Sequence, residues 1–254
     1  MKKHIIFLAC LIPLMSHLHA QQKAKPEDTE IWKPVPEIVK PGKEAGQPSS
    51  DAIILFDGKN LSQWVSSSDT TKPAGWDVEK GVITVNKKKG DIQTKASFTD
   101  YQLHLEWRVP KNITGKGQAR GNSGVFLGAL PDGGYELQIM DSYKNETYVN
   151  GQAGSLYKQH PPLVNPIRPP GEWQVYDVIW TAPKFNTEGT VKSPGRVTAF
   201  FNGVLVQNNA ELKGTTEYIG QPRTVAHGPL PIRLQAHGDP SEPISFRNIW
   251  LRKL

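Results

Sequence analysis

Residues that could do chemistry stand close together in the segment Tyr135–Asp141. It reads Tyr-Glu-Leu-Gln-Ile-Met-Asp and presents Glu136, Gln138 and Asp141. Side chains alternate along a strand, so Glu136 and Gln138 share one face, and a bulge near Met140 would bring Asp141 onto it. Carboxylates beside an amide can bind a sugar and move a proton. The alternative for Asp141 is an Asx turn at a strand end.

A second segment, residues 120–126, reads Arg-Gly-Asn-Ser-Gly-Val-Phe and carries Asn122 and Ser123. It enters a strand through small residues, which let a ligand approach the backbone closely. The segment lacks the strand–turn–helix setting of a nucleophilic serine. We therefore expect Asn122 and Ser123 to bind a ligand rather than to attack it.

Polar residues of similar types alternate with apolar ones in several other segments. They predict a wet sheet face that carries His104, Glu106, Arg108, Glu136, Gln138, Arg233, Gln235 and His237. An ordinary solvated face is the alternative for each residue alone, but such a face would carry more Lys, Thr and Ser. Carboxylates, imidazoles and bidentate donors are what a sugar-binding cleft needs.

The same residues could also hold a metal ion. His104, His237 and Glu136 could converge on a divalent cation, although no short ligand spacing such as a histidine pair at i, i+4 occurs. His160 and His227 lie in expected loops. The sequence does not show which metal would bind or whether the protein requires one.

Strands must position these side chains, and period-two patterns predict them. In 101–109, Leu103, Leu105 and Trp107 alternate with polar residues, and Asn202-Gly203 favours a hairpin turn because both positions suit a positive φ. The predicted core is Leu103, Leu105, Trp107, Tyr135, Leu137, Ile139, Leu234 and Phe246. No persuasive helical period occurs, so the expected fold is all-β, an antiparallel sandwich.

Three regions are expected along the chain. Residues 1–20 have a basic start, an apolar stretch too short to span a bilayer, and Ala20 at a processing position, which predicts a signal peptide and a periplasmic or secreted protein. Cys10 sits in a poor lipidation box. Residues 21–50 are rich in proline and form an extended strap or a linker, and 51–254 form one domain.

Charge and cysteine content exclude several classes of function. The formal net charge is +6, of which two charges lie in the signal peptide, and the single basic run, 87–89, resembles a solvated turn. Nucleic-acid binding is therefore not expected. Cys10 is the one cysteine, so the mature chain has no disulfide framework, thiolate metal site or cysteine nucleophile.

Eight motifs, in order over 51–254, resemble the 3-keto-disaccharide hydrolase family. They are Leu55–Trp64, Gly121–Phe126, Tyr135–Asp141, Gly154–Tyr157, Gly171–Trp173, Phe201–Gly203, Leu234–Gly238 and Phe246–Ile249. The resemblance implies a concanavalin A-like jelly roll, as in lectins and laminarinase-like glucanases. It also implies cleavage of 3-keto-glycosides by elimination followed by hydration.

The motifs and the polar face together give the candidates for the site. The catalytic candidates are Glu136, His237 and Asp141, and the substrate-binding candidates are Asn122, Ser123, Gln138, Arg108, Gln235 and Tyr157. Either Glu136 or His237 would be the base that removes the C2 proton. Asp141 or the remaining member of that pair would be the acid, and Arg108, Gln138 or Asn122 would donate to ring oxygens.

Two other functions fit the same residues. A laminarinase-like glycosidase would pair Glu136 with Asp141 or Glu106, although the pattern Glu136-x-Gln138-x-x-Asp141 replaces a central acid with an amide. A carbohydrate-binding module without activity would use the same fold. Sugar identity, linkage and oligomeric state are not determined by the sequence.

Overall fold

The computed structural model describes residues 24–254 of the chain. The expected signal peptide and Cys10 lie outside the described residues. The chain divides into two units, Met1–Ile38 and Val39–Leu254. In the first, Pro26–Thr29 forms a short 3₁₀-helix, η1. No helix within the described residues is long and apolar enough to cross a membrane.

The second unit is built on two antiparallel sheets. The larger sheet has the order β13-β12-β9-β6-β15-β4-β3, and β1 also pairs with β15. Its strands are β1 (Ile53–Phe56), β3 (Asp77–Glu79), β4 (Val82–Thr84), β6 (Tyr101–Arg108), β9 (Gln174–Thr181), β12 (Arg196–Phe201), β13 (Val204–Glu211) and β15 (Ser245–Lys253).

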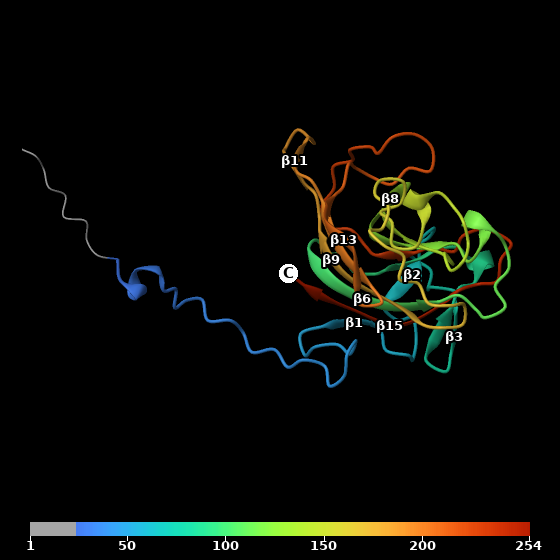
Figure 1. The fold of residues 1–254 in the computed structure, drawn as a ribbon, viewed down its shortest axis with the longest axis horizontal. Helices are drawn as coiled ribbons and strands as arrows, with labels where there is room; N and C mark the ends of the chain where they lie inside the picture. Colours follow the sequence, from blue (N-terminus) through green and yellow to red (C-terminus); the bar gives the residue numbers. More distant parts are fainter. Residues whose placement is uncertain (1–23) are drawn as a thin grey trace, which may run out of the picture. The chain divides into compact units, whose positions relative to one another are not determined.

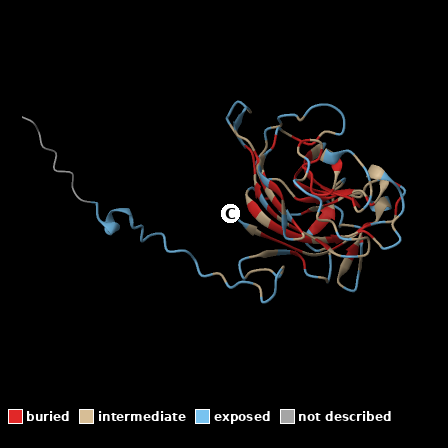
Figure 2. Cartoon of the chain, viewed as in Figure 1, coloured by how far each residue is buried: buried red, intermediate tan, exposed pale blue. Residues whose placement is uncertain are grey.

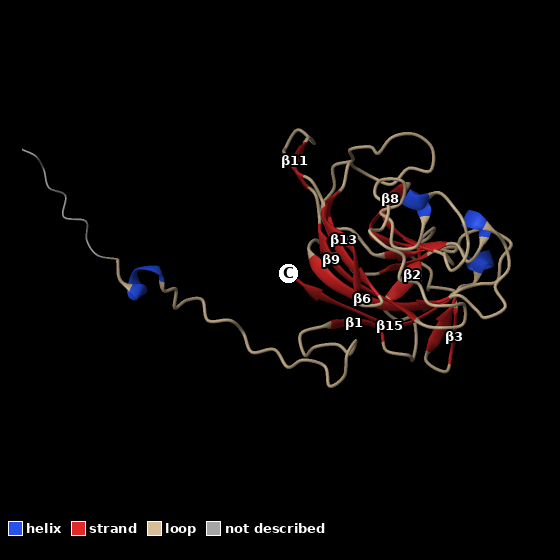
Figure 3. Cartoon of the chain, viewed as in Figure 1, coloured by secondary structure: helices blue, strands red, loops and turns tan. Residues whose placement is uncertain are grey.

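The smaller sheet has the order β2-β5-β14-β7-β8. Its strands are β2 (Trp64–Ser66), β5 (Ile92–Thr94), β7 (Ser123–Leu130), β8 (Gly133–Ile139) and β14 (Arg233–Leu234). The remaining elements are a β10–β11 ribbon (Lys184–Phe185 with Val191–Ser193) and the 3₁₀-helices η2 (Lys87–Lys89), η3 (Gly117–Ala119) and η4 (Val149–Gly151). Within the second unit, β2 and β8 lie on the inner side of the curved larger sheet (Figures 1 and 3).

The core lies between the facing sides of the two sheets. Leu105 and Trp107 of β6 and Leu137 of β8 are fully buried and belong to one cluster. The Tyr176 hydroxyl donates to the Gln138 carbonyl oxygen at 2.7 Å and joins the sheets. Buried residues concentrate on these strands (Figure 2). All eight predicted core residues are buried, and the predicted antiparallel jelly-roll sandwich is confirmed.

The turn between β12 and β13 is the predicted hairpin. Asn202 and Gly203 have φ values of 52° and 80°. Both residue types tolerate this left-handed region better than others, because asparagine bonds locally and glycine has no Cβ. The Asn202 amide also donates to the Pro166 carbonyl at 2.9 Å.

The sandwich corrects the expectation of one shared wet face. His104, Glu106 and Arg108 alternate with core residues on β6 of the larger sheet, whereas Glu136 and Gln138 do so on β8 of the smaller sheet. Because each sheet turns one side toward the common core, its polar side points the opposite way. The two polar sets therefore lie on opposite outer faces of the sandwich.

Candidate active site

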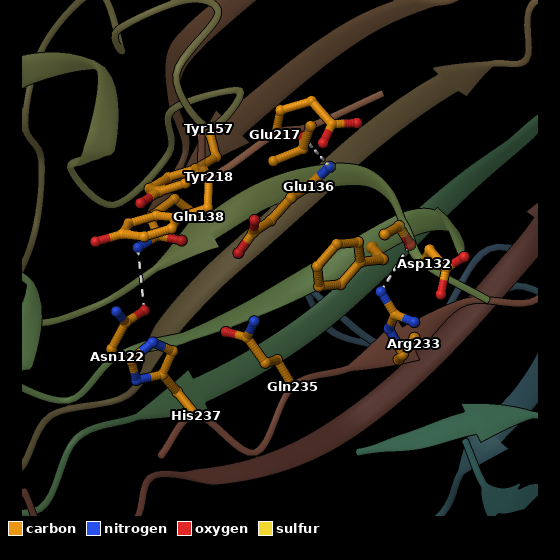
Figure 4. A pocket seen from close by; sticks show the side chains of 13 residues that line it. Asn122, Asp132, Glu136, Gln138, Tyr157, Glu217, Tyr218, Arg233, Gln235 and His237 are labelled. Carbon is orange, nitrogen blue, oxygen red and sulfur yellow. Dashed lines mark hydrogen bonds between the residues drawn. The ribbon is translucent and has the colours of Figure 1, made fainter. Parts of the chain in front are cut away.

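A cavity of about 340 Å³ lies on the outer face of the smaller sheet. Strands β7, β8 and β14, the segment after β14 and the segment after β13 supply its walls. Its lining residues are Asn122, Phe126, Asp132, Gly133, Glu136, Gln138, Tyr157, Thr216, Glu217, Tyr218, Arg233, Gln235 and His237 (Figure 4).

Glu136 stands near the middle of this cavity (Figure 4). Its strand is held at the sheet edge, where the Glu136 N–H donates to the Thr216 hydroxyl at 3.0 Å. Gly124 on β7 pairs with Gln138, and a Cβ there would collide with the Glu136 carboxyl group. The glycine expected to admit a ligand thus makes room first for the catalytic candidate itself.

Burial dominates the electrostatics of Glu136. The residue is 6% exposed, and burial raises the pKa of its carboxyl group to about 8, aided by Asp91 and opposed by Arg233. Arg233 is held away from a direct ion pair, because its guanidinium donates to the Leu130 and Gly133 carbonyls at 3.1 and 2.7 Å. At neutral pH Glu136 is therefore mostly protonated and can donate a proton.

The Gln138 amide bridges Glu136 and Asn122. One of its terminal atoms lies 3.1 Å from both Glu136 Oε1 and the Ser123 carbonyl oxygen. The other lies 3.2 Å from Asn122 Oδ1, to which it donates as drawn (Figure 4). Nitrogen toward Glu136 suits the carboxylate, and oxygen toward Glu136 suits the protonated acid. Rotation of this amide can thus follow the protonation state of Glu136.

His237 faces the same cavity from the segment after β14. Its Nδ1 lies 3.0 Å from Asp239 Oδ2. In the tautomer with the proton on Nδ1, the imidazole donates to this carboxylate and Nε2 can accept a proton from a substrate. In the other tautomer, Nδ1 accepts from the Asp239 N–H at 3.2 Å. Burial opposes ionisation of Asp239, but hydrogen bonds from His237 and Ser241 outweigh it and lower the pKa to about 2.

Lys87 contacts the Asp239 carboxylate oxygen that does not face His237. Lys87 Nζ lies 3.2 Å from Asp239 Oδ1 and donates to the Asp239 and Ser241 carbonyl oxygens at 2.7 and 2.8 Å. The Lys87 side chain is only 23% exposed. The expectation of a solvated turn is therefore wrong for Lys87, which holds the segment that carries His237.

Six sequence-predicted site residues line the cavity together. They are Asn122, Glu136, Gln138, Tyr157, Gln235 and His237. Ser123 does not, because it is buried and its hydroxyl donates to the Gln235 carbonyl at 2.7 Å. Ser123 therefore fastens β7 to the end of β14 instead of touching a ligand.

Two further predictions are corrected. Asp141 is fully buried, forms an ion pair with Arg120 at 2.8 Å and accepts from the Tyr143 N–H at 2.9 Å. It makes the Asx-type contact and does not line the cavity. Arg108 lies on the larger sheet with its guanidinium 4.5 Å above the Trp173 ring, so it cannot reach a substrate beside Glu136.

The three residues that could have converged on a metal ion are not brought together. His104 lies on the outer face of the larger sheet, where Nδ1 is 2.6 Å from Asp177. It is therefore separated from Glu136 and His237 by the core. Among residues 24–254, no three histidine, cysteine or acidic side chains are grouped to hold a metal ion.

Some residues in the cavity or next to it were missed. Arg233 was expected on a polar face, and its spacing from Gln235 and His237 could have placed it in the site. Asp239 follows His237 by two residues, which is a weak signal for a histidine partner. Tyr218 comes from a segment without periodicity, so only the fold reveals it.

Comparisons with known proteins place the chain in a family. Residues 51–252 match the family described as the 3-keto-alpha-glucoside-1,2-lyase-like domain. The crystal structure of a candidate glycosyl hydrolase from Parabacteroides distasonis ATCC 8503 is similar, with 56% identity and a TM-score of 0.86 over 91% of this chain and 97% of that chain. A second such structure from this organism has 20% identity and a TM-score of 0.57 over 80% and 94%, which shows the shared fold.

A curated relative is more distant. The 3-keto-disaccharide hydrolase of Bacteroides thetaiotaomicron is 27% identical over 151 residues, which are 48% of this chain and 49% of that protein. The chain thus spans about half the length of the curated relative that it matches. These names support a carbohydrate-active protein, and the resemblance seen in the sequence motifs is confirmed. The chain belongs to the 3-keto-alpha-glucoside-1,2-lyase-like family.

Proposed function

We propose that this protein is an enzyme that cleaves 3-keto-glycosides by elimination and then hydrates the product. The observation that carries the proposal is a mostly protonated, buried Glu136 sharing one polar cavity with the His237–Asp239 pair. A protonated acid and an oriented base are the two groups that such an elimination requires.

The chemistry depends on the ketone. A C3 carbonyl acidifies the C2 proton, because its removal gives an enolate whose charge rests on the C3 oxygen. The electron pair then forms a C1–C2 double bond while the C1–O bond breaks, and the leaving oxygen takes a proton. Hydration returns a proton to C2 and adds a hydroxyl group at C1.

We assign the base to His237 and the acid to Glu136. Asp239 holds the imidazole and stabilises its protonated form after proton transfer. Gln138 stands beside Glu136, and Asn122 bonds to the other side of the Gln138 amide. Both amides can donate to the enolate oxygen. Gln235 lines the cavity, and its amide oxygen has no hydrogen-bond partner among residues 24–254, so it can accept from a sugar hydroxyl.

A glycosidase would need Glu136 paired with Asp141 or with Glu106, and neither pair forms. Retaining glycosidases need two carboxyl groups about 5–5.5 Å apart. Asp141 is buried against Arg120, and Glu106 lies on the other sheet beside Arg247. Two further acids line the cavity: Glu217 is paired with Arg223 at 2.7 Å, and Asp132 lies at the end of the cavity beside Arg233 (Figure 4). The geometry thus favours elimination over displacement.

Turnover in D₂O tests the proposal. Elimination followed by hydration should place deuterium at C2 of the released 3-keto sugar, as read by mass spectrometry and NMR. The free product incubated without enzyme controls for exchange through the ketone. A C2 position without deuterium above that control would rule out the mechanism.

The parent glycoside provides the second test. With a hydroxyl group at C3 no enolate can form, so it should be nearly inert. Rapid cleavage of the parent compound would favour the glycosidase alternative, and binding without cleavage of either compound would favour a carbohydrate-binding module.

A further inference from the structure

A second cavity of about 450 Å³ adjoins the one that holds Glu136. Asn122, Tyr157, Tyr218 and His237 line both. These shared residues gather at one end of the first cavity, whereas Arg233 lies toward the other end (Figure 4). The two spaces are therefore one continuous groove with His237 at their junction.

Aromatic rings dominate the second cavity. Lys158 Nζ lies 5.7, 5.8 and 4.4 Å from the ring centres of Tyr148, Tyr157 and Tyr218, close enough for cation–π attraction. The Tyr148 and Tyr157 hydroxyls also hydrogen bond to each other. Gly151 leaves space for the Tyr148 ring, with which a Cβ would collide. The Tyr148 and Tyr157 rings are thus held in position by the protein before any ligand binds.

These rings keep open faces. Tyr148 is 40% exposed and Tyr218 is 72% exposed, although both line the cavity. By contrast, Glu136, Arg233 and Gln235 give the first cavity its charged and amide groups. The groove therefore joins a polar part suited to a keto sugar with an aromatic part suited to a flat apolar face.

We propose that this tyrosine cavity, formed by Tyr148, Tyr157, Lys158 and Tyr218, binds the leaving group of the 3-keto-glycoside and selects leaving groups that contain a ring. The proposal rests on the proposed function, since it needs a bond broken at the junction. With the 3-keto sugar beside Glu136 and the base at the junction, C2 and the adjacent C1 lie next to His237. A group attached at C1 then extends into the tyrosine cavity.

The shared chemistry of the expected ligands is a flat apolar ring face. It can come from the C–H face of a pyranose or from an aryl group, and both stack on tyrosine. Aromatic stacking of this kind changes an equilibrium by about 2- to 12-fold at room temperature. The tyrosine cavity should therefore act on selectivity more than on the chemical step.

The test compares Tyr148→Ala with Tyr148→Phe, because Tyr148 lines the tyrosine cavity but not the cavity of Glu136. Three probes are methyl 3-keto-glucoside, phenyl 3-keto-glucoside and a 3-keto-disaccharide, all of the anomer that the wild type cleaves. The ratio of variant to wild-type kcat/KM for each probe cancels its intrinsic reactivity. Lys158→Met, which removes the cation between the rings, serves as an independent second variant.

We expect Tyr148→Ala to lower kcat/KM for the two ring-bearing probes by about 2- to 12-fold more than for the methyl probe. Tyr148→Phe keeps the ring and should retain most of the wild-type preference, and Lys158→Met should lose part of it. Loss with only the phenyl probe would assign the site to aryl groups, and loss with only the disaccharide would assign it to sugars.

Equal effects of Tyr148→Ala on all three probes, with the protein folded by circular dichroism, would overturn the proposal. If the wild-type protein cleaves neither the methyl probe nor the 3-keto-disaccharide, the proposed function itself is overturned. The two failures are thus distinguishable.

Discussion

Two polar clusters on opposite faces of the sandwich contain similar residue types and differ in how their charges are paired. On the smaller sheet, Glu136 is buried with no cation of residues 24–254 in direct contact, and burial raises its pKa to about 8. On the larger sheet, burial likewise disfavours ionisation of Glu106. There, hydrogen bonds from His104, Asn248 and Arg247 outweigh burial and lower the pKa to about 2.

His104 shows the same pairing. Burial opposes its protonation, but Asp177 at 2.6 Å and Glu106 overcome this and raise its pKa to about 9. The ring stacks on Trp250 at 5.1 Å. The Gly46 carbonyl accepts from the Trp250 indole at 3.0 Å and covers the cluster. Residues 39–50 thus contact β15 within the second unit. That the whole of residues 21–50 forms an extended strap stays a prediction.

The comparison separates structural chemistry from reactive chemistry. Buried ions that pair with each other hold their charge and close the surface, as around His104. A buried acid without a partner holds its proton and opens onto a cavity, as Glu136 does. Residue type alone is therefore a poor guide to function in this protein.

The largest expected effect is on activity when Glu136 changes. Glu136→Gln removes the acid and should lower kcat on a 3-keto-glycoside by about 10²–10⁴-fold. Glu106→Gln, on the opposite face, should change kcat by less than about 3-fold, since it lies outside the cavity. Equal loss in both variants would break the distinction between the clusters.

A smaller loss is expected when the orientation of His237 is disturbed. Asp239→Asn keeps the size but removes the charge that holds Nδ1, so kcat should fall by about 10²-fold with little change in KM. A partly unfolded sample would also show a lower apparent kcat at an unchanged KM, so kcat must be normalised to the number of active sites found by titration. Wild-type kcat in Asp239→Asn would remove His237 from the role of base.

The pH dependence should follow Glu136. Its acid form predominates below about 8, so kcat/KM should decline as pH rises through about 8. A Glu136→Gln variant should lack this basic limb in its residual activity. A limb that persists unchanged in the variant would assign the ionisation to another group.

The smallest expected effect concerns stability around His104. Its pKa in the folded state, about 9, lies above the value of 6.5 for an unpaired histidine. This pairing therefore stabilises the fold fully below about pH 6.5, and the contribution is lost as pH rises through about 9. Because the Asp177 side chain is 42% exposed, screening limits the effect to about 1–3 kcal/mol.

His104→Gln should thus unfold at lower denaturant concentration than the wild type at pH 6. The difference between the two proteins should shrink by pH 10, and activity should stay within about 2-fold. A difference that grows with pH would contradict the pairing of His104 with Asp177 and Glu106.

Local patterns predicted much of this protein. Alternation placed Leu105, Trp107 and Leu137 in the core, because a strand on a two-layer sandwich must bury every second side chain. The same period put Glu136 and Gln138 side by side. The Asn202-Gly203 turn also followed from local chemistry, since it depends on the φ values that these two residues tolerate.

Only the tertiary structure decided which polar residues work together. Alternation along a strand shows that a residue faces away from the core, but it does not show which of the two outer faces carries that residue. For this reason Arg108 and His104 were wrongly grouped with Glu136. The role of Asp141 could be assigned only once its ion pair with Arg120 was seen. Tyr218 could be placed in the cavity only once its segment was seen to cross the edge of β8. The sequence by itself determined the sheets, the core and the pairs of neighbours along each strand. Which acid is left unpaired, and hence reactive, depends on contacts between residues far apart in the chain, which no local pattern contains.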